Sequence, residues 1–163
     1  MAFSVKLLLL RTVWFKLHLY LALSLGLLFV LQGLTGSISV YRDEIDQLLN
    51  PQLTVQSGAG AYLSLDKIIA VVHAAEPDRH GVWTLEMPRK PGQTMTAWFE
   101  KPRETIDAFY APLMLAINPY TGEVLEKRFW GQTATTWLLD LHSHLLLEAK
   151  GRNYLAVVAV LML

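Results

Sequence analysis

The chain contains one long stretch without Asp, Glu, Lys or Arg: LHLYLALSLGLLFVLQGLTGSISVY, residues 17–41. As an α-helix, these roughly 25 residues would extend about 37 Å. The hydrocarbon core of a bilayer is about 30 Å thick, and about 20 apolar residues are needed to cross it. The stretch therefore predicts a transmembrane helix, which we place at residues 12–41.

A buried helix of a soluble protein and a cleaved signal peptide remain as alternatives. Soluble helices rarely run uncharged for this length. A signal peptide has a shorter apolar core, about 7–15 residues, followed by a small-x-small cleavage site. Here QGLTGS, residues 32–37, is followed by the apolar residues Ile38 and Val40, without a clean Ala-x-Ala. An uncleaved anchor is therefore the favoured interpretation.

The charges that flank this stretch predict its orientation. Basic residues precede it and acidic residues follow it: Lys6, Arg11 and Lys16 on one side, and Asp43, Glu44 and Asp46 on the other. By the positive-inside rule, residues 1–11 form a cytoplasmic N-terminus. The following domain then lies outside, which for a bacterial inner (cytoplasmic) membrane is the periplasm.

The composition excludes several classes of function. Hydrophobic residues make up 53% of the 163 residues and charged residues 17%, which is too apolar for an intrinsically disordered chain. The 14 basic residues balance the 14 acidic ones, and this balance argues against a nucleic-acid binder. The chain has no cysteine, so disulfides, thiolate zinc sites and cysteine nucleophiles are excluded.

The middle of the chain predicts a small α+β domain at residues 62–128, after a linker at residues 42–61 that is polar and rich in Gly from about residue 52. Ser64 is placed to cap a helix, because apolar residues recur at helical spacing after it. Alternating or apolar runs at residues 82–87, 94–100, 111–117 and 123–125 predict three to four antiparallel strands. The expected fold class is α+β, in a membrane protein.

The last third predicts a return to the membrane. Residues 129–153 are expected to form an amphipathic interfacial helix capped by Thr133, and residues 154–163 are wholly apolar. Ten residues cover only about 15 Å as a helix, half a bilayer. We therefore expect residues 154–163 to begin a second transmembrane helix of a longer protein, whose further C-terminal helices would be partners of this chain. A single long helix over residues 138–163 is the alternative, although it would place the charged residues near 151 inside the bilayer.

Histidines are the candidate site residues: His18 in the predicted span, and His142 and His144 in the predicted amphipathic helix. A neutral imidazole is a ligand for haem iron or another transition metal. His142 and His144 would project about 200° apart on a helix, so they cannot hold one metal from a regular helix. His18 lies too far along its helix to join His142. The competing interpretation is that all three are interfacial side chains bonded to water or headgroups. No catalytic triad, HExxH motif or paired carboxylates stand out, so no catalytic residue is predicted.

Five segments together resemble a known family, the PepSY-associated transmembrane family. The first three resemble its first helix, the fourth resembles the turn that ends a PepSY domain, and the last resembles the approach to its second helix. They are WFKLHLY at residues 14–20, GLTG at 33–36, YRDEID at 41–46, NPYTGEVL at 118–125 and WLLDLHSHLL at 137–146.

This resemblance implies a bacterial inner-membrane protein with PepSY-type periplasmic insertions, often tied to iron uptake. Some members are similar to siderophore-iron reductases that hold haem b between helices, and His18 and His142 match the recurrent helix histidines, with His144 a less certain match. The implied function is transmembrane electron transfer to a ferric siderophore, which would make the full protein an oxidoreductase. A non-catalytic PepSY module that binds peptide or regulates a periplasmic peptidase, and a structural subunit of an iron-uptake complex, remain as alternatives.

Overall fold

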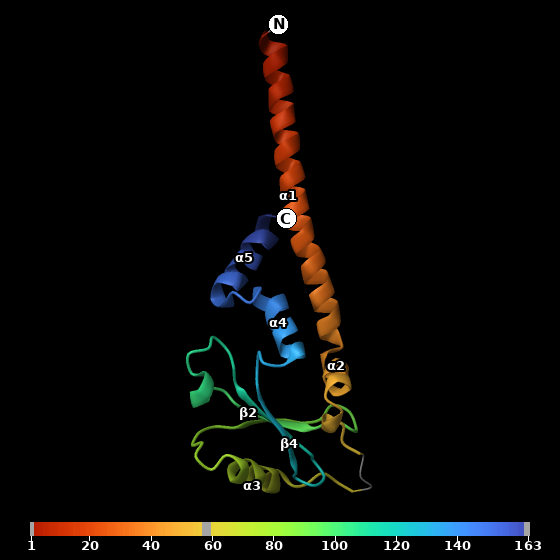
Figure 1. Cartoon of the computed structure of the whole chain (residues 1–163), viewed down its shortest axis with the longest axis vertical. Coiled ribbons are helices and arrows are strands. Elements are labelled where there is room, and N and C mark those ends of the chain that lie inside the picture. The colour runs from red at the N-terminus through yellow and green to blue at the C-terminus, as the bar shows by residue number, and fades with distance from the viewer. Residues whose placement is uncertain (1, 57–59, 162–163) are drawn as a thin grey trace. The chain divides into compact units, whose positions relative to one another are not determined.

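The computed structural model describes residues 2–56 and 60–161, and the side chains of residues 10–56 and 60–160. The chain divides into two compact units, which we describe separately. Unit 1 comprises residues 1–40 and 141–163, and unit 2 comprises residues 41–140. The predicted linker residues Ser57, Gly58 and Ala59 and the last two residues of the predicted second span lie outside the described part (Figure 1).

Helix α1, Ala2–Val40, forms most of unit 1. It begins ten residues before the predicted start, because no Pro or Gly interrupts the helical run upstream of residue 12. The most apolar 18-residue window of its segment Leu10–Val40 has a mean hydropathy of 1.9, and no part of that window is buried. Among the described residues, this is the one helix long and apolar enough to cross a membrane.

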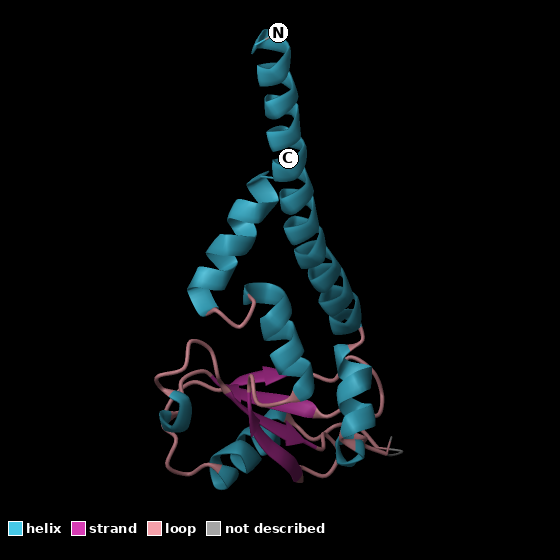
Figure 2. Ribbon diagram, turned by 45° about the horizontal axis from the view of Figure 1, so that its top comes forward, coloured by secondary structure: helices cyan, strands magenta, loops and turns pink. Residues whose placement is uncertain are grey.

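The C-terminal part of unit 1 differs from the predicted continuous helix over residues 129–153. Helix α4, Ala134–His144, ends there, and helix α5, Glu148–Leu161, begins after a short turn (Figure 2). Leu145, Leu146 and Glu148 have positive φ values of 55°, 57° and 55°. Non-glycine residues rarely adopt this left-handed conformation, so residue propensities do not predict a turn here.

Unit 2 contains a four-stranded antiparallel sheet in the order β1-β2-β3-β4, which confirms the predicted α+β class. The strands are β1 Thr84–Glu86, β2 Met95–Phe99, β3 Leu113–Ile117 and β4 Val124–Phe129. β4 extends to Phe129, four residues beyond its predicted end, because it pairs along the whole length of β3. Residue 129 therefore belongs to the sheet and not to the helix that follows.

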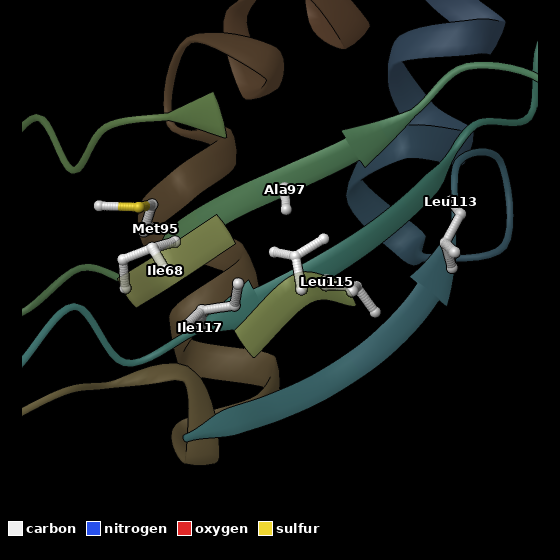
Figure 3. Packing of buried hydrophobic residues seen from close by; sticks show 7 residues of the cluster. Ile68, Met95, Ala97, Leu113, Leu115 and Ile117 are labelled. Atoms are coloured by element: carbon white, nitrogen blue, oxygen red, sulfur yellow. The ribbon is translucent and has the colours of Figure 1, made fainter. Parts of the chain in front are cut away.

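One face of the sheet packs on helix α3, Leu65–Ala75, to form the core. Ile68 and Val72, one turn apart, lie against alternate strand residues: Met95, Ala97, Leu113, Leu115 and Ile117 (Figure 3). Seven fully buried apolar side chains form this cluster, and burial of each of the larger ones stabilises unit 2 by about 1.5–3 kcal/mol. The predicted helix and its spacing are confirmed.

The predicted linker is partly helical. Helix α2, Arg42–Leu49, and the 3-10 turn η1, Pro51–Leu53, occupy its first half. Asp43 and Glu44 lie in the first turn of α2, where their negative charges stabilise the positive end of the helix dipole. A second 3-10 turn, η2, covers Arg103–Thr105 between β2 and β3. The α2 helix was not expected because its stabilising contacts come from β4, far along the sequence.

Candidate functional site

The imidazole of His142 lies against α1 within unit 1. Its Nδ1 is 3.2 Å from the hydroxyl oxygen of Thr35, a residue that is 4% exposed. The single hydroxyl hydrogen of Thr35 is donated to the backbone carbonyl of Leu31 at 2.7 Å. With that hydrogen on Leu31, the Thr35 oxygen is free to accept a hydrogen bond from the Nδ1–H tautomer of His142. In this tautomer the other ring nitrogen, Nε2, keeps its lone pair and can bind a metal ion.

Gly36 makes room for this ring. A Cβ atom at residue 36 would lie 2.8 Å from Cε1 of His142 and 3.4 Å from both ring nitrogens. Gly33, three residues earlier on α1, has nothing within 4 Å of the same position. The GLTG segment thus supplies two matched glycines, of which only the second faces the histidine.

His144 lies in the last turn of α4, two residues beyond His142, and its side chain is half-buried. Its backbone carbonyl accepts the amide hydrogen of Leu147 at 2.9 Å and lies so close to Gly151 of α5 that a Cβ there would overlap it. The structure therefore gives the backbone of His144 a clear role in the turn between α4 and α5.

His18 is exposed on α1. Seventeen residues of helix separate it from Thr35, which corresponds to about 26 Å at 1.5 Å per residue. His18 and His142 therefore cannot bind the same metal ion, as the sequence predicted. Within the described residues there is also no group of three or more His, Cys, Asp or Glu side chains that could hold a metal ion.

Unit 2 contains an ion pair that the sequence analysis missed. Both guanidinium NH groups of Arg128, on β4, donate to the two carboxylate oxygens of Asp46, on α2, and one of these bonds measures 3.0 Å. The Thr135 hydroxyl donates to the same carboxylate at 3.4 Å. The three residues border a pocket of about 110 Å³ on the sheet face opposite α3, which Trp98 and Trp130 also line. No sequence motif marks this pair, because its members are 82 residues apart.

A second charged cluster connects the C-terminal end of α3 to the edge strand β4 and to the turn η2. Glu76 accepts hydrogen bonds from Arg79 at 2.6 Å and from Lys127, and Arg79 also donates to Glu104. Burial by itself would raise the pKa of Glu76, but the hydrogen bonds from Lys127 and Arg79 outweigh it and hold the pKa below its ordinary value. The hydrogen bond from Arg79 likewise lowers the pKa of Glu104. These shifts make the cluster a source of pH-dependent stability.

The chain matches one known protein family over most of its length. The family described as the PepSY-associated TM region matches residues 15–163. This chain belongs to that family. No curated protein matches it significantly. The family resemblance of the five sequence segments is thus confirmed, and the matched range contains α1 from residue 15 onward, the whole of unit 2 and the described part of α5.

Membership of the PepSY-associated TM region family identifies a transmembrane protein and agrees with the length and apolar character of α1. A lipid bilayer is therefore the environment of this PepSY-associated chain. His18, His142 and His144 all fall within the matched residues. Their roles stay predictions, because the family description assigns no ligand to them.

Proposed function

We propose that this PepSY-associated chain supplies histidine ligands for b-type haem in a transmembrane protein that reduces ferric siderophore iron during iron uptake. The observation that carries the proposal is the arrangement of His142. Its Nδ1 lies 3.2 Å from the Thr35 hydroxyl, and in the Nδ1–H tautomer its Nε2 keeps the lone pair that a metal ligand needs. A hydrogen bond to the second ring nitrogen is the usual way in which proteins orient a metal-binding histidine.

His142 and His18 would each supply one imidazole ligand, and each imidazole would serve a separate haem. His142 offers one oriented imidazole and His18 offers another, about 26 Å away along α1 by helix rise. Each haem would take its second ligand from a further helix or a second copy of the chain. His144 projects from α4 in a different direction from His142 and is proposed as the alternative ligand beside it.

Haem iron held by imidazoles moves single electrons at a potential set by its ligands and its burial. The residues of this chain contribute orientation and insulation. Thr35 holds the His142 ring at Nδ1, Gly36 allows the close approach of the ring, and the length and apolar character of α1 suit the water-poor interior of a bilayer. The acceptor we propose is chelated ferric iron, which hard oxygen ligands hold more tightly than ferrous iron, so reduction favours release.

Absorbance spectroscopy of the purified full-length protein tests this proposal. We expect a Soret band and an α-band that sharpens on reduction with dithionite. His142→Ala should lower the haem content at least fivefold, and His18→Ala should lower it partially. His73→Ala, at an exposed position of α3, is the matched control and should leave the spectrum unchanged. A colourless preparation, or a His142→Ala spectrum identical to that of the parent, contradicts the proposal.

A non-catalytic binding role is the second candidate, and the pocket at Asp46, Arg128 and Trp98 favours it. Charged groups beside indole rings suit a short peptide that presents a carboxylate and an apolar side chain. A colourless protein that binds peptides in calorimetry, and loses that binding in Arg128→Met, would support this role over electron transfer.

The remaining alternative is a structural subunit of an iron-uptake complex. This role predicts co-purifying partner proteins and no ferric reductase activity.

We also propose that the N-terminus is cytoplasmic and that unit 2 lies in the periplasm. The flanking charges support this orientation. Because the chain has no native cysteine, Thr121→Cys provides a single label site on an exposed turn of unit 2. A membrane-impermeant maleimide added to intact cells should label it. Labelling only after the inner membrane is opened would reverse the assignment.

A further inference from the structure

Residues 105–111, between β2 and β3, form an exposed apolar loop with an ordered backbone. Ile106 is 58% exposed, Phe109 42% and Tyr110 45%. The Thr105 hydroxyl donates to the Ala111 carbonyl at 2.6 Å, and the Ala108 amide donates to the Thr105 carbonyl at 3.0 Å. Internal hydrogen bonds therefore hold the loop in a shape that presents its large side chains to the surroundings.

Aromatic contacts join this loop to helix α4. The rings of Tyr110 and Trp130 lie 5.5 Å apart at 72°, an edge-to-face arrangement. The indole nitrogen of Trp130 donates to Asp140 on α4 at 2.9 Å. Trp137, which is 47% exposed, precedes Asp140 by three residues and so shares its face of the helix. We call Ile106, Phe109, Tyr110, Trp130 and Trp137 the aromatic ridge.

The aromatic ridge lies at the end of unit 2 from which the chain continues into unit 1. Phe99, Leu113 and Phe129 pair across the sheet at this end, so the loop after β2 and the segment after β4 leave the sheet together. The segment after β4 leads to Asp140, where unit 2 ends. At the other boundary, Asp46 of α2 binds Arg128, the neighbour of Phe129. The connection that follows β4 therefore starts at the ridge.

We propose that the aromatic ridge rests in the interfacial layer of the lipid bilayer and gives unit 2 a membrane contact of its own. Trp and Tyr favour this layer because each ring has an apolar body and a polar tip. The charged residues around the loop are of both signs: Glu100, Lys101, Arg103, Glu104 and Asp107. Attraction to anionic lipid is therefore not the driving force, and zwitterionic lipid suffices. The inference does not depend on haem.

Depth-dependent quenching of a fluorescent label tests the contact. Because the chain has no native cysteine, Ile106→Cys carries one environment-sensitive label in the full chain, reconstituted at one copy per phosphatidylcholine nanodisc. Thr121→Cys is the matched control, in the turn before β4 at the opposite end of the sheet, where Met95 pairs with Ile117. We expect a blue-shifted emission at residue 106 and quenching by nitroxide-labelled lipid at least threefold stronger than at residue 121.

A second substitution separates the ridge from its surroundings. Phe109→Ser in the Ile106→Cys background should reduce lipid quenching at residue 106 at least twofold, while circular dichroism confirms that the sheet is retained. Equal access of aqueous iodide to residues 106 and 121 overturns the proposal. A blue shift that appears only at several copies per disc assigns the ridge to a second copy of the chain, and quenching that requires anionic lipid assigns the contact to charge. Both results overturn the proposal.

Discussion

At the scale of single residues, the most informative contact is the one between Thr35 and His142. A threonine that gives its only hydrogen to its own helix offers a lone pair to a neighbour, and this favours the tautomer of His142 that carries hydrogen on Nδ1. The same hydroxyl appears in the sequence as an ordinary small residue of a GLTG segment. Only its contact with His142 gives it a chemical role.

Gly36→Ala should displace the His142 ring. The added Cβ would lie 2.8 Å from Cε1, and a side-chain ring can move away more readily than backbone. We expect the hydrogen bond to Thr35 to be lost and the two ring nitrogens to become more alike in their nitrogen-15 chemical shifts. Gly33→Ala, with nothing within 4 Å, is the control and should keep the parent spectrum. Unchanged shifts in Gly36→Ala would show that the ring does not lie against α1.

Gly151→Ala should destabilise the turn between α4 and α5. A Cβ at residue 151 would overlap the carbonyl of His144, and that backbone cannot move without breaking its bond to Leu147. Overpacking of this kind costs about 1–3 kcal/mol or more. Gly26→Ala, at a helical glycine with open surroundings, should not lower stability. Thermal unfolding in detergent compares the two, and equal midpoints would contradict the close packing.

At the scale of elements, the pairing of α2 with β4 shows how a short helix persists. The eight residues of α2 are too few for a stable isolated helix in water. The ion pair between Asp46 and Arg128, with side chains only 15% and 18% exposed, connects the helix to the sheet. Tertiary contact therefore supplies what the local sequence lacks.

Asp46→Asn should weaken unit 2 by about 2–3 kcal/mol, somewhat less than the loss of one partner of a fully buried pair, because it removes the nearer carboxylate of Arg128 and leaves only Glu126, at 3.6 Å. Glu44→Gln tests the exposed pair between Glu44 and Lys90, whose side chains are 53% and 68% exposed. That control should leave stability nearly unchanged, as for most exposed ion pairs. Urea unfolding followed by tryptophan fluorescence measures both. Similar losses in the two variants would argue against a special role for Asp46.

At the scale of the whole molecule, stability should depend on pH through unit 2. The pKa values of Glu76 and Glu104 are lowered in the folded state, since Lys127 and Arg79 favour the ionised carboxylates over the burial that opposes ionisation. Their stabilisation is complete above the ordinary Glu pKa of about 4.3 and is lost as the pH falls through the lowered folded values. We therefore expect unfolding midpoints to be constant near neutrality and to fall below about pH 4.

Glu76→Gln provides the direct check of this pH dependence. The variant should be less stable than the parent at pH 7 and should lose less additional stability on acidification, because one of the linked carboxylates is gone. Glu123→Gln, at an exposed turn position, is the control and should keep the parent profile. Parallel pH curves for Glu76→Gln and the parent would show that the cluster makes no such contribution.

The regular parts of the molecule were predictable from local patterns. The uncharged run at residues 17–41, the spacing of Ile68 and Val72, and the alternating strands each express a preference that neighbouring residues share. The apolar faces of the helix and the strands are buried because apolar side chains are driven out of water, and they pack against each other. The α+β class and the family followed from these elements and from the order of the motifs.

The irregular parts were not predictable in this way. The end of α4 at His144, the helix at residues 42–49 and the ion pair of Asp46 with Arg128 depend on groups that are distant in sequence or on backbone strain that neighbours impose. The histidines show both cases. Their residue type alone indicated possible ligands, and the helical rise excluded a shared site for His18 and His142. The orientation of His142 emerged only when folding brought its ring to Thr35, because a hydrogen bond needs both partners in place, and residues 107 positions apart carry no local signal that they will meet.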